Sequence, residues 1–219
     1  GFMKSNTLFD NNQYGFLQGC STTMLLLKVM DEWTKILDEG DSVNVIYTDF
    51  SKAFDTVPHG RLISKLSGYG IRGKMLTWIG EFLKDRKQRV VVQGEASSWE
   101  WVKSGVPQGS VLGPILFLIY INDITEGIKS EAYLFADDMK LFSRVVDIHS
   151  SMVLQNDLDI VMRWTKKWLL SLNIGKCKVL AMGKGAGSFD YEVDIVSGRV
   201  RLERSALERD LGVQVDSEL

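Results

Sequence analysis

The chain has 219 residues, of which 45% are apolar and 25% are charged, and this ordinary globular mixture excludes a disordered, collagen-like or coiled-coil protein. Only two cysteines and two histidines are present, which excludes a disulfide-stapled fold and argues against a Cys-rich or His-rich metal site. The longest apolar run, residues 111–121, is too short to span a bilayer, so we expect no membrane segment. The low cysteine count fits a reducing, intracellular compartment.

The net charge is −2, but the charges are distributed unevenly along the chain. Residues 60–103 hold nine Lys or Arg against four Asp or Glu, whereas residues 31–59 hold seven acids against two bases. A basic segment beside an acidic one suits a polyanion held next to a metal site. Two ordinary solvated surfaces would show the same pattern, so charge alone does not decide the function.

Apolar periodicity, capping residues and turn residues predict an alternation of helices and strands. In chain order, the expected elements are a helix at 21–39, a strand at 43–50, helices at 60–68 and 73–84, strands at 88–93 and 99–103, a fully buried helix at 111–124, a hairpin at 133–142 with Asp137 and Asp138 at its tip, a helix at 150–172, a strand at 177–182, and two or three short strands near 189–194, 198–202 and 211–215.

Without the insertion at about 60–103, the order is βαββαβ, which is typical of a ferredoxin-like sheet in an α+β fold. We expect the helices to cover one face of this sheet and to leave the other face for a ligand. In this order the first strand and the hairpin are neighbours at the centre of the sheet. Polymerase palms share the arrangement with many unrelated binding modules, so the site residues must decide the function.

Three carboxylates are expected to meet at the centre of this sheet. Asp49 closes the first strand, and Asp137 and Asp138 stand together in the hairpin. Each alone suits a solvated turn, but three clustered carboxylates cannot all stay ionised without a cation. Oxygen ligands without His or Cys favour Mg²⁺ or Mn²⁺, and two such ions support nucleotidyl transfer.

Six stretches carry a resemblance to a known family, and they occur in that family's order along nearly the whole chain. They are QYGFLQGCSTT (13–23), YTDFSKAFDTVPH (47–59), SGVPQGSVLGPILFLIYINDI (104–124), YLFADDMKLF (133–142), WLLSLNIGKCKVL (168–180) and RDLGVQVDSEL (209–219). The chain resembles the reverse transcriptase domain of non-LTR, LINE-type, jockey-like retrotransposons. The resemblance implies a polymerase palm with partial fingers, and an RNA-directed DNA polymerase that extends a DNA primer on an RNA template with dNTPs.

The resemblance also implies roles for the carboxylates and their neighbours. Asp49 and Asp137 would bind both Mg²⁺ ions, with Mn²⁺ as a substitute, and Asp138 would be a weaker third carboxylate. Phe50 would lend its backbone carbonyl to one ion. Lys176 would protonate the departing pyrophosphate as a general acid.

Further roles concern the nucleotide and the nucleic acid. Phe54 matches the aromatic gate that excludes a 2′-hydroxyl, although a core phenylalanine is the alternative interpretation. Gln108 and Gly109 match the loop that positions the incoming nucleotide and the template, and Lys178 rivals Lys176 as the general acid. The basic residues expected to contact nucleic acid are Lys84, Arg86, Lys87 and Arg89.

Two positions depart from the family pattern. Leu17 and Cys20 stand where basic residues are usual, and neither can clamp a triphosphate as arginine does.

We expect partial fingers at 1–42, a palm at 43–182 that contains the insertion, and at 183–219 the end of the palm, with the joint at 183–187 and the thumb missing. Nucleus and cytoplasm are the expected locations.

Two other functions remain open. The first is a catalytically inactive fragment or decayed copy that folds and at most binds nucleic acid. The second is a metal-dependent phosphotransferase of another palm-like class, such as a nucleotide cyclase. Phe54 and the Gln108 loop disfavour a cyclase, because that reaction needs neither a sugar gate nor a template loop. The sequence leaves the oligomeric state open.

Overall fold

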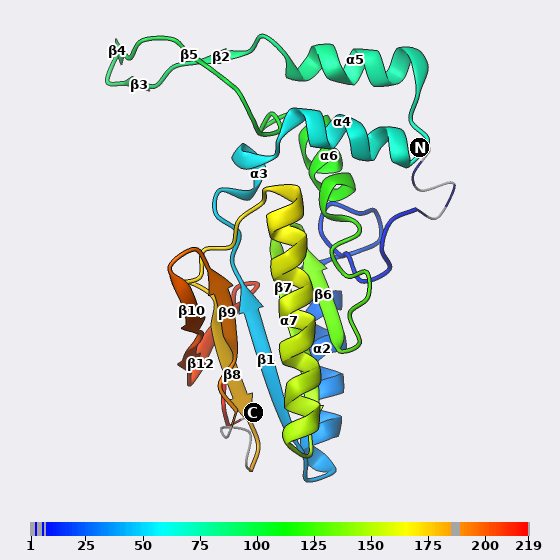
Figure 1. Cartoon of the computed structure of the whole chain (residues 1–219), viewed down its shortest axis with the longest axis vertical. Helices are drawn as coiled ribbons and strands as arrows, with labels where there is room; N and C mark the ends of the chain where they lie inside the picture. Colours follow the sequence, from blue (N-terminus) through cyan, green and yellow to red (C-terminus); the bar gives the residue numbers. More distant parts are fainter. Residues whose placement is uncertain (1–2, 4–5, 7, 185–188, 219) are drawn as a thin grey trace.

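A five-stranded sheet in the order β11-β8-β1-β7-β6 forms the centre of the computed structural model, which describes residues 3, 6, 8–184 and 189–218 (Figure 1). Its strands are β1 (Ser42–Thr48), β6 (Glu131–Phe135), β7 (Asp138–Val145), β8 (Lys178–Met182) and β11 (Glu203–Ser205). All neighbours are antiparallel except β11 and β8. The predicted ferredoxin-like order is confirmed, and β1 and β7 lie side by side as expected.

The helices occupy the expected parts of the chain, except for the short α3 at residues 53–56, which was not predicted. They are α2 (Thr22–Asp38), α3 (Ala53–Thr56), α4 (His59–Gly68), α5 (Gly73–Leu83), α6 (Leu112–Ile121) and α7 (Ile148–Trp168). Ser21 caps α2 by accepting a hydrogen bond from the backbone N–H of Met24, and Asp147 and Ser150 form a capping box at α7. No helix in the described ranges is long and apolar enough to cross a membrane.

Both faces of the sheet are covered, so the expectation of one open face is wrong. Helices α6 and α7 lie on one face, and α2 lies behind the other (Figure 1). Leu25, Val29 and Trp33 of α2 are fully buried in a second apolar cluster that includes residues of β1, β7 and β8. Strand β1 is buried on both sides: Val43 and Val45 contribute to the cluster with α2, and Ile46 contributes to the cluster on the opposite face. Only the strand ends are left to form a site.

The insertion carries a projecting hairpin of residues 86–103, here called the arm (Figure 1). Its strands are β2 (Lys87–Gln88), β3 (Val91–Val92), β4 (Glu95–Ala96) and β5 (Glu100–Trp101). The two predicted strands are therefore each interrupted, since β2 pairs with β5 and β3 pairs with β4 in separate ladders. The fully exposed ladders have no core to pack against, so the arm stays outside the body of the molecule.

The chain after β8 contains more strands than were predicted. The tail contains β9 (Glu192–Ile195), β10 (Gly198–Arg201), β12 (Leu207–Asp210) and β13 (Val213–Asp216), besides β11. Strand β11 was missed because its three residues are polar and gain order only by pairing with β8. Residues 185–187 of the predicted joint lie outside the described residues.

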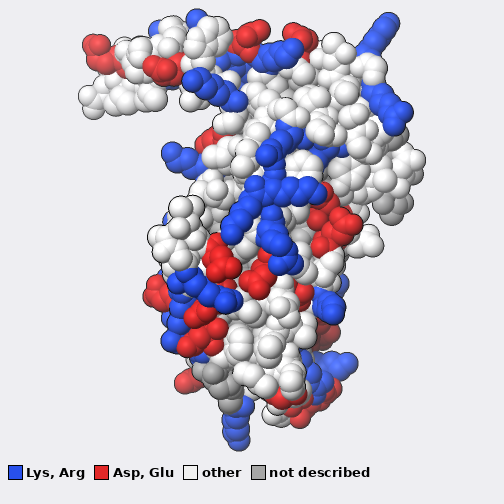
Figure 2. All heavy atoms as spheres, in the orientation of Figure 1, with Lys and Arg blue, Asp and Glu red and all other residues white. Residues whose placement is uncertain are grey.

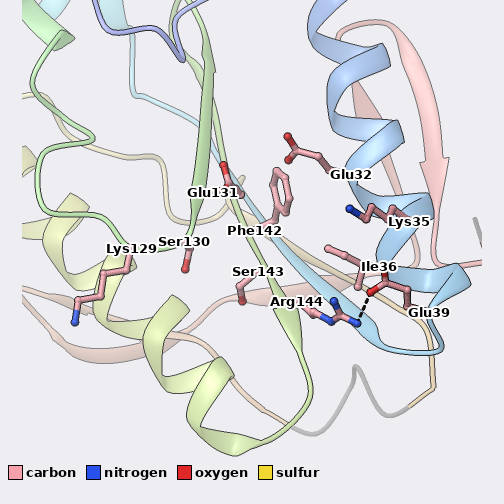
Figure 3. Close-up of a pocket in the computed structure, with 10 residues that line it drawn as sticks. All are labelled: Glu32, Lys35, Ile36, Glu39, Lys129, Ser130, Glu131, Phe142, Ser143 and Arg144. Carbon is pink, nitrogen blue, oxygen red and sulfur yellow. Dashed lines mark ion pairs between the residues drawn. The ribbon is translucent and has the colours of Figure 1, made fainter.

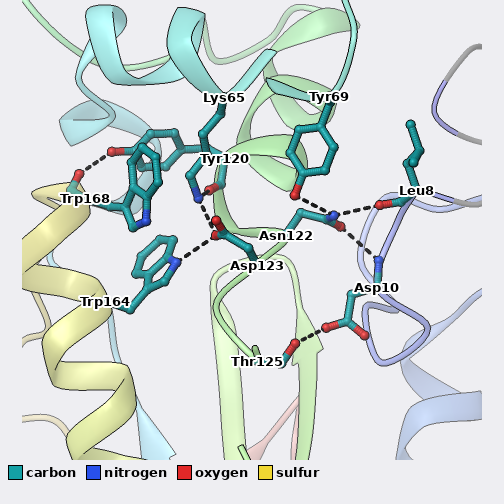
Figure 4. A network of polar contacts seen from close by, with 10 residues as sticks. All are labelled: Leu8, Asp10, Lys65, Tyr69, Tyr120, Asn122, Asp123, Thr125, Trp164 and Trp168. Atoms are coloured by element: carbon teal, nitrogen blue, oxygen red, sulfur yellow. Dashed lines mark hydrogen bonds and ion pairs between the residues drawn. The ribbon is translucent and has the colours of Figure 1, made fainter. Parts of the chain in front are cut away.

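A buried lysine joins the insertion to the body of the molecule (Figure 4). The Lys65 ammonium donates hydrogen bonds to the Tyr120 carbonyl and the Asp123 carboxylate, and its nitrogen lies 4.0 Å from the centre of the Trp168 ring. Trp164 donates to the same carboxylate at 2.7 Å. This contact ties α4 to the end of α6 and to α7, which lie far apart in the sequence. Burial lowers the pKa of Lys65 to about 8, although Asp123 opposes the shift.

Stability should therefore rise with pH above 8. Because the pKa of Lys65 is lower in the folded chain, the unfolded chain binds more protons between pH 8 and 10.5. Raising the pH from 7 to 9.5 should increase the free energy of unfolding by about 2 kcal/mol through this group. Urea unfolding at both pH values measures the gain. Lys65→Met should reduce the gain by about 2 kcal/mol, and the exposed Lys74→Met should keep the gain of the parent chain; an equal gain in both variants would contradict the assignment.

Candidate active site

Asp49 lies one residue beyond the end of β1, at the edge where the sheet meets the insertion. Its backbone carbonyl accepts a hydrogen bond from the N–H of Asn173 at 2.7 Å, and Ser51 N–H donates to the Ser171 carbonyl at 2.8 Å. These two bonds flank the bridge between Phe50 and Leu172, so the bridge does not use the Phe50 carbonyl. Asp49 is thus held from the backbone, while its side chain stays 38% exposed.

Asp137 occupies the two-residue turn between β6 and β7, where Phe135 pairs with Asp138. The preceding Ala136 has a left-handed φ of 58°, which is unfavourable for a residue with a side chain. The buried Gln13 side chain holds this conformation, because its oxygen accepts the N–H of Ala136 at 2.9 Å. The prediction placed both aspartates at the tip of the hairpin, but only Asp137 lies there, because Asp138 is the first residue of β7.

A glycine permits this clamp. Gly15 lies so close to the turn that an added Cβ would be 2.2 Å from the backbone nitrogen of Ala136. Its N–H also donates to the Gln13 oxygen at 2.6 Å. The motif QYGF therefore packs its backbone against the aspartate turn, and any side chain at position 15 would displace that turn.

The three carboxylates are electrostatic neighbours. Burial raises the pKa of Asp137, and the negative charge of Asp49 raises it further. Partial desolvation also raises the pKa of Asp138, with contributions from Asp137, Asp210 and Asp49, while Lys140 lowers it. The β1–β7 pairing thus concentrates negative charge at one place, which a cation would offset.

The oxygen atoms around the carboxylates are of the chemical type that binds a divalent cation. Carboxylate oxygens of Asp49 and Asp137, with the Phe50 carbonyl beside them, are ligands that Mg²⁺ prefers. Within the described ranges, no group of three His, Cys, Asp or Glu side chains forms a ready-made metal site.

The structure distinguishes the two candidate lysines. The Lys176 ammonium lies 3.8 Å from a carboxylate oxygen of Asp49, and its side chain is 67% exposed. The Lys178 ammonium instead pairs with Glu203 of β11. The geometry therefore favours Lys176 as the cation beside the carboxylates.

Phe54, Gln108 and Gly109 line one cavity of about 490 Å³. Phe54 stacks on the buried Phe117 with ring centres 4.3 Å apart, and Phe16 meets its edge at 6.1 Å. Phe54 is thus both a packed residue and a cavity wall, so the two interpretations of it are compatible. The predicted full burial of α6 is wrong at its start, since Ile115 is 39% exposed, and Val111, just before the helix, is 89% exposed and lines this cavity.

Two other cavities lie apart from Phe54 and the carboxylates. Leu17 and Cys20 line one of about 250 Å³ at the amino-terminal segment. Another, of about 390 Å³, lies between α2 and β7 and holds the ion pair of Arg144 with Glu39 (Figure 3). Neither contains a predicted site residue.

The residues predicted to contact nucleic acid lie on two elements. Lys84 lies at the end of α5 and pairs with Glu81 at 3.2 Å, whereas Arg86, Lys87 and Arg89 belong to the arm. The arm is not uniformly basic, since it carries both positive and negative side chains (Figure 2).

Comparison with known proteins decides the family. The sequence profile described as "Reverse transcriptase (RNA-dependent DNA polymerase)" matches residues 2–203. The chain belongs to the reverse transcriptase family. It is 31% identical over 174 residues to the RNA-directed DNA polymerase from mobile element jockey of Drosophila funebris, covering 75% of this chain and 19% of that protein. It is 29% identical over 186 residues to the probable RNA-directed DNA polymerase from transposon BS of Drosophila melanogaster, covering 78% and 20%.

These relatives confirm the resemblance to non-LTR, jockey-like elements, and the chain spans about a fifth of their length. Solved structures show the same fold. A telomerase from Candida albicans, in complex with a fragment of telomeric RNA, superimposes with a TM-score of 0.64 at 12% identity over 99% of this chain and 36% of that one. A telomerase from Candida tropicalis gives 0.61 at 14% identity over 98% and 36%. Reverse transcriptases generally use divalent metal ions.

Several residues around the carboxylates were missed from the sequence. Lys140 and Asp210 form a buried ion pair on the same side of the sheet as Asp138, and Tyr47 donates to Asp210 at 3.5 Å. A lysine inside the apolar stretch MKLF was the available signal, because a buried ammonium needs an anion. Gln13 gave no such signal, since its role depends on a turn more than 120 residues away.

Metal binding should be visible as stabilisation of the folded chain. Because the pKa of Asp137 is raised, its charge destabilises the fold near neutral pH, so Asp137→Asn should raise the melting temperature without metal. Mg²⁺ at ten times its dissociation constant should raise the melting temperature of the parent chain by about 3–5 °C and that of Asp137→Asn by less. Calorimetry measures both, with the exposed Asp31→Asn as the control. Equal Mg²⁺ responses in all three chains would exclude Asp137 as a ligand.

Proposed function

We propose that this chain is the polymerase core of a retrotransposon reverse transcriptase that extends a DNA primer on an RNA template. The observation that carries the proposal is the grouping of three charged side chains: the charge of Asp49 acts on Asp137, and the Lys176 ammonium lies 3.8 Å from Asp49. Family membership supports this activity, and the jockey relatives are named for it. The primer, the template and the dNTP are the partners implied.

Each residue has a defined task in this proposal. Asp49 and Asp137 would hold two Mg²⁺ ions, with Asp138 as an auxiliary carboxylate and Phe50 offering its carbonyl. Bound Mg²⁺ would activate the primer 3′-hydroxyl and stabilise the charge on the leaving pyrophosphate. Lys176 is close enough to the carboxylates to deliver a proton to that pyrophosphate. Gln108 and Gly109 would position the nucleotide above Phe54.

Primer extension with dNTPs on an RNA template tests the proposal. Asp49→Asn and Asp137→Asn should each reduce nucleotide incorporation to background, because each removes a negative charge that the cations require. Circular dichroism should show an unchanged fold. The isosteric control Asp31→Asn, on the exposed surface of α2, should extend normally. Normal extension by the two site variants would refute the carboxylate assignment.

A second candidate function is supported by one departure from the family pattern. Leu17 and Cys20 line a mainly apolar cavity and offer no cation to a triphosphate. A chain that folds and binds nucleic acid without extending a primer would be an inactive remnant. Absence of extension by the unmodified chain, together with retained RNA binding, would favour this function.

Sugar selection provides a separate test of the Phe54 cavity. Phe54→Val should admit ribonucleotides, because removing the ring opens space for one hydroxyl group. The preference for dNTP over rNTP should fall by roughly 10- to 200-fold. Single-nucleotide incorporation with both substrates gives the ratio within one protein, so a general loss of activity cancels. An unchanged ratio would assign Phe54 to packing against Phe117 alone.

A further inference from the structure

A buried ion pair that the proposed function does not use lies beside the carboxylates. The Lys140 ammonium donates hydrogen bonds to both oxygens of the Asp210 carboxylate, and the two side chains are 3% and 4% exposed. Tyr47, which stands opposite Lys140 in the β1–β7 ladder, donates to Asp210 at 3.5 Å. Replacing such a buried pair by packed apolar residues is often neutral or stabilising, so stability alone does not explain its presence.

The position of Lys140 on β7 brings its charge close to Asp138. Alternate residues of a strand share one face, so these two side chains are neighbours on the same side of the sheet. Burial raises the pKa of Asp138, and the charge of Lys140 opposes that shift. Among the described residues, however, Asp210 is the only carboxylate with which Lys140 forms an ion pair. Lys140 is therefore near the aspartates but is not bonded to them.

A buried ammonium bonded to Asp138 would interfere with a metal ion. Both cations are attracted by the same negative charge, so the ammonium would offset part of the charge that draws Mg²⁺ to this end of the sheet. Lys176, which lies beside Asp49, is a different case, because its side chain is 67% exposed and can move into solvent. Lys140 is enclosed and needs an anion wherever it lies. Asp210 supplies that anion from outside the group of aspartates.

The tail hairpin holds Asp210 in this place. Asp210 ends β12 and pairs with Val213 across the two-residue turn of Leu211 and Gly212. Both turn residues have a left-handed φ, 47° for Leu211 and 93° for Gly212, as in the tight turns that suit β-hairpins. This conformation is unfavourable for leucine, and the surrounding packing maintains it, since Leu211 contacts the apolar cluster that includes α2. The hairpin is thus fixed on the sheet with the Asp210 carboxylate at Lys140.

We propose that Asp210 is a positioning residue that holds Lys140 away from Asp138 and so keeps the aspartates available to Mg²⁺. The inference rests on the proposed function in one respect, namely that Asp49 and Asp137 bind the metal. The alternative role for the pair is purely structural, in which Lys140 and Asp210 only fasten the tail hairpin to the sheet. The two roles predict different effects of removing one partner and of removing both.

A Mg²⁺ titration followed by melting temperature distinguishes these roles, because it gives the concentration that produces half of the maximal stabilisation. Asp210→Asn releases Lys140 toward Asp138 and should raise that concentration roughly 10-fold or more. Adding Lys140→Met to Asp210→Asn removes the competing cation and should return the concentration to that of the parent chain. A structural role predicts no such rescue, because the double variant also lacks the ion pair.

The double variant keeps the test decisive if Asp210→Asn does not fold. Asp210→Asn leaves a buried ammonium without its partner, which is strongly destabilising, whereas the double variant buries no unpaired charge at this place. The proposal requires the double variant to respond to Mg²⁺ as the parent chain does. A loss of 10-fold or more in the double variant would show that the pair itself is needed, and would overturn the proposal.

A second measurement, made in EDTA, needs no metal. In the Asp210→Asn chain the released Lys140 should pair with Asp138, so adding Asp138→Asn should lower the melting temperature by about 4–8 °C. In the parent chain the same substitution should not lower it, because burial already disfavours the Asp138 charge. Equal effects in the two chains would show that Lys140 does not turn to Asp138, and would overturn the inference. If Mg²⁺ fails to stabilise the parent chain, the metal assignment fails while this result still tests the role of Asp210.

Two controls complete the experiment. Asp210→Glu keeps a carboxylate for Lys140, so its response to Mg²⁺ should stay close to that of the parent chain. Glu81→Gln frees Lys84 from an exposed ion pair on α5 and should leave the Mg²⁺ concentration unchanged. A 10-fold rise in Asp210→Glu, or an equal rise in Glu81→Gln and Asp210→Asn, would contradict a specific role of the Asp210 charge.

Discussion

The antiparallel pairing of β1 with β7 is the constraint on which the candidate site depends. Its register sets Thr48 opposite Met139, so the residues that follow β1 and precede β7 meet at one end of the sheet. Asp49, Asp137 and Asp138 are brought together by backbone hydrogen bonds, against the repulsion of their own charges. The apolar residues of β1, buried on both faces, stabilise this register strongly enough to hold the carboxylates near one another.

The insertion is coupled to this centre through buried polar contacts rather than through the sheet. Lys65 fixes α4 against the end of α6 and α7, and Asp55 anchors Gln108. Gln108 lines both the Phe54 cavity and a polar cavity at the base of the arm, so its loop lies between the two. His59 at the start of α4 contacts the Gly105 carbonyl at 2.8 Å, and Asp55 of α3 accepts a hydrogen bond from Gln108, so both helices contact the segment that leads to α6.

Much of the fold was predictable, because its signals are local. The apolar strand before Asp49, the capped helix after Ser21 and the hairpin at Asp137 each have their own pattern of residues. The coverage of the second face was not predictable, since it depends on α2 and Val215 of β13 packing in one cluster against the same face of the sheet. The polar strand β11 and the interrupted ladders of the arm also depend on partners rather than on their own residues.

The same distinction between local signals and distant partners applies to the candidate site. Motif positions located Asp49, Asp137, Phe54 and Lys176, whereas the partners that orient them are distant in sequence. The Lys140–Asp210 pair joins two motifs 70 residues apart.

The contact of Gly15 with the aspartate turn has a consequence for how such sequences lose activity over generations. A mobile-element copy that is no longer under selection accumulates changes at all positions alike. A single Gly15→Ser change would leave every carboxylate in the reading frame and still displace Ala136, because the added Cβ would meet its backbone nitrogen. Gly15 is therefore as informative as the aspartates about whether a copy retains an intact site.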